Sequence, residues 1–396
     1  MDFAFGPLDE AFRTDARAWL DEHLGGTHAE ADRPGGPRSE LERGATPRAW
    51  ERELGAAGWI GIGWAEPGYG NRQAGLTQQV VWAEEYSRAG APSRVGHIGE
   101  NLLAPTLIAH GTTAQKDRFL PAVARGDELW CQGYSEPGAG SDLAGIRTAA
   151  VRDGDTYRIS GQKIWTSLAQ DADWCFVLAR TEPGSQRHHG LSFLLVPMDQ
   201  PGRVDVRPIR QMTGTSEFNE VFFDGAEARA EHLVGGEGNG WRVAMSLLAF
   251  ERGVSTLAQQ IGFAEELSRV IGLAVANGAA DDPVLEERLV RQWAELRTMR
   301  WNALRTLGGT ADPGAPSVAK LLWGGWHQRL GELAMAVRGA RAAVGPCDWS
   351  SEKPYELDAL QRLFLFTRAD TIYGGSDEIQ RNIIAERVLG LPREPR

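Results

Sequence analysis

Residues 133–145 read GYSEPGAGSDLAG and follow a short run of β-favouring residues, 129–134. The Gly-Ala-Gly segment at 138–140 has almost no side-chain bulk, so a diphosphate can approach its backbone N–H groups. Ser135 and Ser141 add hydroxyl donors. The pattern therefore indicates either an anion-binding loop or an ordinary Gly/Ser connection between two elements, and it does not decide between them alone.

A second stretch, Lys163-Ile164-Trp165-Thr166-Ser167, lies at the end of the next expected strand. A Trp beside two hydroxyl residues can stack on a flat ring and hydrogen-bond to its polar edge. The alternative interpretation is that Trp165 packs in a core, as most tryptophans do.

A third stretch, residues 372–381, reads IYGGSDEIQR. Its two glycines end one helix, and Ser376 can cap the next. The acidic residues Asp377 and Glu378 suit the first turn of that helix because of its dipole. By itself this pattern also fits a plain corner between two helices.

The chain of 396 residues has three zones of different texture. We predict an N-terminal helical domain at 1–128, a central β domain at 129–238 and a C-terminal helical bundle at 239–396. Short β-rich runs between turns define the central zone, which suggests a sandwich or small barrel. The expected strands are Leu129–Tyr134, Tyr157–Ile164, Trp174–Ala179, Leu191–Val196, Val204–Pro208 and Asn219–Phe223.

Helical periodicity defines the other two zones. The expected N-terminal helices include Thr46–Ala57, Leu76–Ala89 and Leu103–Gly111. The expected bundle helices are Trp241–Ala276, Pro283–Leu307, Ser317–Ala343, Glu356–Ile372 and Ser376–Leu389.

Composition narrows the function. The net charge is −11, which disfavours binding to nucleic acid or to anionic membranes but leaves room for a phosphate held by local backbone groups. No run approaches the roughly 20 apolar residues that cross a bilayer. Three well-separated cysteines and no metal-ligand spacing predict neither a disulfide framework nor a metal site, and we expect a cytoplasmic protein.

The three motifs, in this order and on this layout, resemble the acyl-CoA dehydrogenase family over essentially the whole chain. More narrowly, the chain resembles the actinobacterial branch that includes heteromeric sterol side-chain acyl-CoA dehydrogenases. Residues 133–145 fit the first family signature except that Tyr134 replaces a usual aliphatic residue, and residues 372–394 fit the second closely. The resemblance implies an α+β fold: an N-terminal helical domain, a central β-barrel or sandwich, and a C-terminal four-helix bundle, with FAD between them.

The resemblance also implies site residues. Tyr134, Ser135 and residues 165–167 would meet the flavin ring, Ser141 the diphosphate and the substrate, and the turn at 375–378 the nucleotide half. The expected cofactor-binding residues are Tyr134, Ser135, Gly140, Ser141, Trp165, Thr166, Ser167, Gly375, Ser376 and Glu378, and the expected substrate-binding residues are Ser141 and Arg252.

The implied reaction removes an α-proton from an acyl thioester and passes a β-hydride to flavin N5. Many relatives place the catalytic Glu directly after the Tyr of the C-terminal turn, where this chain has Gly374. Other relatives place it in a Glu-Arg pair on the first bundle helix, which here is Glu251-Arg252. A helical stripe supports Glu251 as the base, because this carboxylate interrupts an apolar face. The stripe is formed by Ala244, Leu247, Glu251, Val254 and Leu257.

Two family segments that complete the FAD site of a neighbouring subunit have no match. An Arg-x-x-Phe-Gly segment and a Gln-x-x-Gly-Gly-x-Gly segment are expected where this chain reads AVANGAA at 274–280 and GARAAVGP at 339–346. Either a second dehydrogenase-like chain completes the site, or a homo-oligomer holds FAD by other contacts. The resemblance further implies an electron-transferring flavoprotein as acceptor.

Two other functions remain open. A flavin-dependent monooxygenase or oxidase of the same fold has no need for a carboxylate at Glu251. A non-catalytic subunit of a heteromeric dehydrogenase would explain Gly374 and the missing segments, whereas Glu251 and the intact 133–145 loop speak against it. The acyl group, and the choice between CoA and a carrier protein, cannot be read from the sequence.

Overall fold

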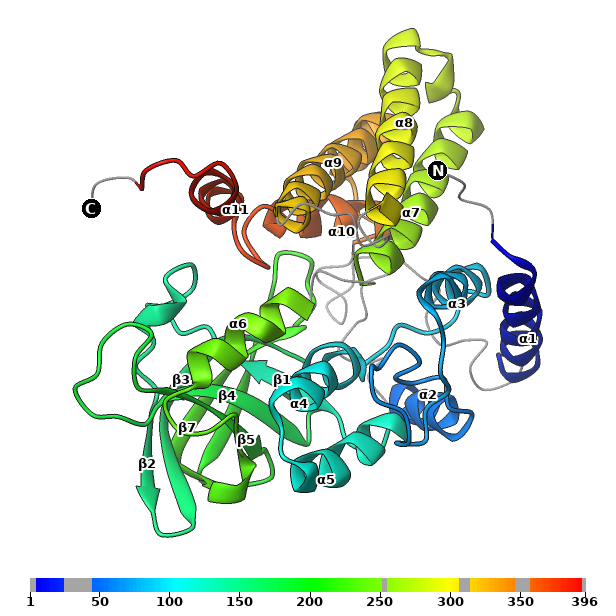
Figure 1. The fold of residues 1–396 in the computed structure, drawn as a ribbon. Coiled ribbons are helices and arrows are strands. Elements are labelled where there is room, and N and C mark those ends of the chain that lie inside the picture. Colours follow the sequence, from blue (N-terminus) through cyan, green and yellow to red (C-terminus); the bar gives the residue numbers. More distant parts are fainter. Residues whose placement is uncertain (1–4, 25–44, 251–254, 306–313, 346–356, 394–396) are drawn as a thin grey trace.

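The computed structural model describes residues 5–24, 45–250, 255–305, 314–345 and 357–393. A single sheet forms the centre of the chain, the N-terminal helices lie beside it, and the helices α7 to α10 lie above both (Figure 1). This order of helices, sheet and helices confirms the α+β fold expected from the sequence.

The N-terminal helices are α1 (Pro7–His23), α2 (Ala45–Ala56), α3 (Leu76–Arg88), α4 (Ala104–His110) and α5 (Thr113–Ala124). Their core is aromatic: the rings of Trp59 and Trp82 stack with centroids 4.1 Å apart. A π-helical turn, Gly99–Leu103, leads into α4. Helix α5 was not among the expected helices, although Thr112 and Gln115 form a capping box at its start.

The central strands are β1 (Trp130–Gly133), β2 (Ala149–Asp153), β3 (Thr156–Ser167), β4 (Trp174–Arg180), β5 (Leu191–Pro197), β6 (Val204–Ile209), β7 (Phe218–Arg229) and β8 (Leu233–Val234). They join in one sheet in the order β6-β7-β3-β2-β4-β5-β8, and β1 pairs in parallel with β4. All six expected strands are present. The strands β2 and β8 were missed because β2 reads AAVRD, with little β-branched character, and β8 has only two residues.

Both faces of the sheet are covered by apolar side chains, and β4 shows why. Its Cys175, Val177 and Ala179 join one core cluster, whereas Phe176 and Leu178 join another. Side chains alternate between the faces of a strand, so a continuous apolar run is buried on both sides. Helices α4, α5 and α6 (Gly240–Phe250) cover the face that carries Phe176.

The bundle consists of α7 (Ser255–Asn277), α8 (Pro283–Arg305), α9 (Ala315–Arg338) and α10 (Ala359–Phe366), followed by α11 (Asp377–Ile383). The helix expected at Trp241–Ala276 is described as two helices, α6 and α7, on either side of the undescribed residues 251–254. The fourth helix is shorter than expected: α10 ends at Phe366 and continues as one 3₁₀ turn, Thr367–Ala369.

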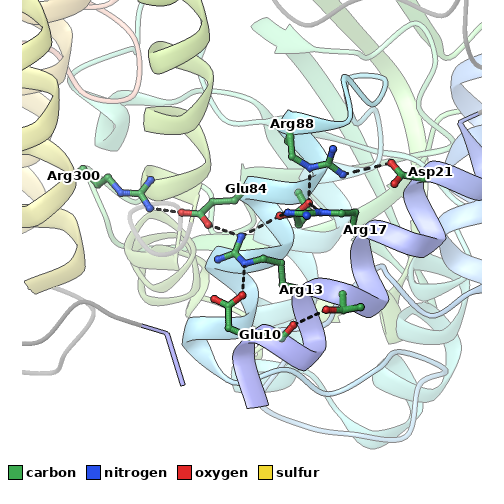
Figure 2. Close-up of polar contacts among 9 residues, drawn as sticks. Glu10, Arg13, Arg17, Asp21, Glu84, Arg88 and Arg300 are labelled. Atoms are coloured by element: carbon green, nitrogen blue, oxygen red, sulfur yellow. Dashed lines mark hydrogen bonds and ion pairs between the residues drawn. The ribbon is translucent and has the colours of Figure 1, made fainter. Parts of the chain in front are cut away.

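Charged side chains fasten α3 to its neighbours (Figure 2). Arg17 and Arg13 of α1 donate to Glu85, and Arg88 adds a third guanidinium. Hydrogen bonding to Arg17, helped by the other two arginines, lowers the pKa of Glu85 to about 2. One carboxylate oxygen of Glu84 accepts a hydrogen bond from Arg13, and the other accepts one from Arg300 of α8. This network joins the N-terminal helices to the bundle.

Within the described ranges, no helix has the length and apolar character needed to cross a bilayer. Cys131 and Cys175 lie opposite each other on β1 and β4, and both are free thiols in the core. Cys347 lies outside the described residues. No cluster of three or more metal-ligating side chains occurs among the residues that the structure describes.

Candidate active site

A buried ion pair organises the 133–145 loop. Lys163 of β3 is fully buried, and its Nζ lies 2.8 Å from Oε1 of Glu136. The same ammonium donates to the carbonyls of Tyr134 at 3.0 Å and Leu178 at 2.8 Å. All three of its N–H groups therefore have acceptors, which is the condition under which a buried charge is tolerated.

Glu136 in turn fixes the end of the loop. Its carboxylate accepts the backbone N–H groups of Arg147 at 2.6 Å and Thr148 at 2.9 Å. Burial alone would raise the pKa of Glu136, but the Lys163 ammonium and these hydrogen bonds outweigh it and hold the pKa below its ordinary value. One carboxylate thus links both ends of the loop to β3.

Between those ends the loop exposes bare backbone. Gly138 and Gly140 are exposed, and a Cβ added to either would meet no atom within 4 Å. A cavity of about 480 Å³ lies beside this loop and is lined in part by Gly138, Asp142, Arg147 and Gln162. The predicted residues Gly140 and Ser141 are exposed on the same loop, and Ser135 is half-buried at its start.

The side chain of Tyr134 points away from this surface. The residue is 5% exposed, and its ring packs edge-on against Phe176 and Phe193, with centroids 5.9 and 6.3 Å away. Its ring is thus part of the core, and its carbonyl is bound by Lys163.

The end of β3 is conformationally unusual. Trp165 has a φ of 60°, which is rare for a bulky residue, and its ring is 56% exposed. The next residue, Thr166, is fully buried, and its Oγ1 has no hydrogen-bond partner within the described part of the protein. Its carbonyl accepts from Asn219 of β7 at 3.0 Å. A strained, exposed indole beside an unsatisfied buried hydroxyl is typical of a functional site.

The C-terminal turn has the expected construction. Gly374 and Gly375 have φ values of 65° and 83°, which are costly for other residues. Ser376 caps α11, because its side chain accepts from the Ile379 N–H at 3.5 Å. Hydrogen bonds from its own backbone and from Ser376 hold the pKa of the exposed Glu378 below its ordinary value.

The end of β3 contacts the residues around the start of β7. Glu217 directly precedes β7. The carbonyl of Glu217 accepts from the Leu168 N–H at 3.0 Å. The neighbouring Phe218 ring meets the Trp165 ring edge-on at 6.2 Å. The start of β7 therefore packs against the end of β3.

Glu251 and Arg252 lie outside the described residues. The apolar stripe on which Glu251 was predicted is present in α6, where Ala244 and Leu247 are fully buried.

Sequence reasoning did not single out the Glu136–Lys163 pair or the buried His327 of α9. Like Glu251, both Lys163 and His327 are polar residues at positions where the surrounding sequence pattern is apolar. Lys163 falls at an inward position of a strand, between the buried Ile159 and Thr166, and His327 interrupts the apolar face of its helix.

Comparison with known proteins covers all three zones. Residues 7–127 match the N-terminal domain of acyl-CoA dehydrogenases, residues 131–226 the middle domain and residues 238–389 the C-terminal domain.

Similar proteins extend over the full length. The chain is 58% identical to the acyl-CoA dehydrogenase IpdE1 of Mycobacterium tuberculosis, over 97% of this chain and 98% of that protein. It is 54% identical to IpdE1 of Mycolicibacterium smegmatis, with the same coverage. Among solved structures, the Tcur3481-Tcur3483 steroid ACAD matches with a TM-score of 0.85 and 29% identity, covering 100% of both chains. The ChsE4-ChsE5 complex from Mycobacterium tuberculosis matches with a TM-score of 0.82 and 31% identity, also covering 100% of both chains. Sequence and fold agree, and the chain belongs to the acyl-CoA dehydrogenase family.

Proposed function

We propose that this chain is the catalytic subunit of an FAD-dependent dehydrogenase that introduces an α,β double bond into an acyl-CoA thioester. The observation that carries the proposal is the end of β3, where an exposed Trp165 in a strained conformation adjoins the unsatisfied, buried Thr166 hydroxyl. A flat ring with polar edges fits this pair, because it offers the indole a stacking face and the hydroxyl a hydrogen-bond partner.

The described residues fit FAD at the loop as well. The exposed backbone at Gly138 and Gly140 leaves room for a diphosphate, and the Ser141 hydroxyl adds a donor. The Glu136–Lys163 pair holds this loop before any cofactor binds, so little ordering is needed on binding. In the C-terminal turn, Gly375, Ser376 and Glu378 are the proposed contacts of the nucleotide half. When bound, FAD supplies the hydride acceptor of the reaction.

Glu251 is the proposed base. The turn that carries the base in many relatives offers only Gly374 here, which has no side chain, so the proton must be removed by another residue. The buried Ala244 and Leu247 anchor helix α6, which ends one residue before Glu251. A carboxylate on an apolar stripe is partly shielded from water, which raises its basicity toward that needed for an α-proton. Arg252 is the proposed contact of the acyl or CoA end.

The proposed substrate is the CoA thioester of a steroid side chain, and the proposed acceptor is an electron-transferring flavoprotein. The similarity to the Tcur3481-Tcur3483 steroid ACAD over the whole chain supports this substrate class.

The proposed partner is a second, dehydrogenase-like chain. Residues 274–280 and 339–345 hold none of the family side chains that complete a neighbour's FAD site. Helix α8 also exposes an aromatic face: Trp293 is 53% exposed and Trp301 49%, with the Arg297 guanidinium between the two rings at 5.7 and 5.9 Å. Tryptophan and arginine are the residues most enriched at the centres of protein interfaces, which suits such a partner.

The test is anaerobic titration of the flavin-loaded protein, with and without a co-expressed partner, with short-chain, branched and steroid thioesters. The steroid thioester should bleach the flavin, and Glu251→Gln should keep the flavin but lose bleaching. Near-normal bleaching by Glu251→Gln would exclude this residue as the base. Bleaching that depends only on the partner's own carboxylate would instead identify the chain as the non-catalytic subunit, the function that Gly374 favours.

A further inference from the structure

A buried histidine joins two parts of the bundle. His327 of α9 is 4% exposed, and its two ring nitrogens lie between two carboxylates. Nδ1 is 2.7 Å from Oδ2 of Asp370, and Nε2 is 2.7 Å from Oε2 of Glu266 on α7. Asp370 is fully buried just after the last 3₁₀ turn, and the Glu266 side chain is 23% exposed.

Two ionised carboxylates on the two ring nitrogens favour an imidazolium. A neutral ring has one N–H and one lone pair, and the lone pair would face a carboxylate oxygen. Burial alone would lower the pKa of His327, but the hydrogen bonds and charges of Asp370 and Glu266 raise it to about 9.

Lys320 and Tyr373 also bind Asp370. Lys320, one turn before Trp323 on α9, donates to the Asp370 carbonyl and lies over the rings of Trp323 and Tyr373, at 3.8 and 4.7 Å. The Tyr373 hydroxyl donates to Oδ1 of Asp370 at 2.9 Å.

The other elements around His327 present neutral groups. Helix α8 contributes the amide of Gln292, which donates to the Trp326 carbonyl, and α7 adds the Phe263 ring, 4.2 Å from the imidazole. Among the described residues, the charged groups that contact the imidazole are thus Glu266 from α7 and Asp370 from the turn, and Lys320 from α9 binds the Asp370 carbonyl.

The two carboxylates belong to segments that matter for the reaction. Helix α7, which carries Glu266, starts four residues after Glu251. Asp370 precedes Gly374 by four residues and holds the Tyr373 hydroxyl directly. The His327 imidazolium therefore connects helix α7, which follows the proposed base Glu251, with the turn in which Gly374 stands at the position of the catalytic Glu of many relatives.

We propose that His327 is a positioning residue that sets the separation between helix α7 and the Tyr373–Gly374 turn, and thereby the alignment of the thioester with its base. This role rests on the proposed function. His327 acts through Glu266 and Asp370 and takes no part in the proton transfer itself.

The experiment compares His327→Gln with Arg329→Gln in the assembled, flavin-loaded protein. Arg329 lies two residues away on α9 and pairs with Glu295 of α8 at the surface. Arg329→Gln therefore also removes a cation that joins two helices, and it serves as the matched control. Anaerobic flavin reduction by the bleaching thioester is followed from pH 6 to 10, together with FAD content.

At pH 7, His327→Gln should reduce the flavin about tenfold more slowly than the wild type, since small displacements of reacting groups have effects of this size or larger. FAD content should stay unchanged. The wild-type rate should fall as pH rises through about 9 and approach that of the variant, whereas the variant should lack this fall. Arg329→Gln should follow the wild-type profile.

Glu266→Gln provides a second variant, since it keeps the histidine and removes one partly exposed charge. Its alkaline fall should move to lower pH, because the imidazolium has lost a carboxylate. A direct measurement accompanies it: the ring resonance of His327 should titrate near pH 9 in the wild type and at lower pH in Glu266→Gln.

If the wild type bleaches but neither variant alters the pH profile, the positioning role is overturned and the proposed function stands. If the resonance titrates near pH 6.5, the imidazolium is excluded and the role with it. A wild type that no thioester bleaches overturns the proposed function itself, whatever the resonance does.

Discussion

Lys163 and Glu136 form an ion pair 2.8 Å long in the core of the middle region, with 0 and 9% of their side chains exposed. Removing one member of such a pair leaves the other charge buried and unpaired. The pair also fixes the loop that carries Gly138 and Gly140, so the stability of the protein and the binding of its cofactor depend on the same contact.

Lys163→Met should therefore lower the free energy of unfolding by about 3–5 kcal/mol and reduce bound FAD. Thermal unfolding and the ratio of flavin to protein absorbance measure both effects. Lys116→Met, which breaks the partly exposed pair with Glu66, is the control and should change stability by less than about 1 kcal/mol. Equal effects of the two substitutions would contradict an organising role for Lys163.

Removing the Thr166 hydroxyl should affect protein stability and FAD affinity differently. In the protein without flavin, Thr166→Val should leave stability unchanged or raise it by up to about 1 kcal/mol, because the buried Oγ1 has no partner to lose among the described residues. In the holoprotein the same substitution should weaken FAD binding about fivefold to tenfold, since a hydrogen bond to the cofactor is lost.

Ser160→Ala is the control for Thr166→Val, because its hydroxyl accepts from the Gly225 N–H at an exposed position of β3. Unchanged flavin affinity in Thr166→Val would show that this hydroxyl does not meet the cofactor.

The pKa of His327 makes stability depend on pH. A folded-state pKa of about 9, against an ordinary value of 6.5, means that its contribution is complete below pH 6.5 and disappears as pH rises through 9. Two and a half units correspond to about 3 kcal/mol. The difference in unfolding free energy between the wild type and His327→Gln should thus be largest near pH 6 and close to zero at pH 10. Urea unfolding at four pH values tests this, and a pH-independent difference would contradict it.

The exposed tryptophans of α8 predict a specific loss of assembly. Trp293→Ala with Trp301→Ala should weaken association with the partner chain at least thirtyfold, at about 2 kcal/mol or more for a central aromatic anchor. The stability of the isolated chain should change little, because both rings are about half exposed. Val284→Ala, an exposed apolar residue in the first turn of α8, is the control. Unaltered association in sedimentation would place the interface elsewhere.

Much of this architecture was predictable because hydrophobic periodicity and the residue types of turns are local properties of the sequence. The six expected strands and the turn at Gly374 and Gly375 follow from residues that are neighbours in sequence. The ends of elements were less predictable: α10 stops at Phe366, six residues before the predicted end, where 3₁₀ geometry takes over.

The polar contacts of the site could not be predicted, because they join distant segments. Lys163 meets Glu136 across 27 residues, and His327 meets Asp370 across 43 and Glu266 across 61. A single Lys or His at an inward position signals that some partner exists, but only the fold identifies the partner. The side chain of Tyr134 is a further example, since nothing in the loop sequence places its ring in the core against Phe176.

The network around helix α3 has a consequence for how the protein emerges from the ribosome. Arg13 lies 71 residues from Glu84, but Arg300 lies 216 residues from it, and Ser87 reaches Glu265 across 178 residues. The N-terminal helices can thus assemble early in translation, while one oxygen of Glu84 stays hydrated until α8 has been synthesised (Figure 2). Helix α3 therefore contacts both early and late parts of the chain, and its contacts are complete only once α8 has been synthesised.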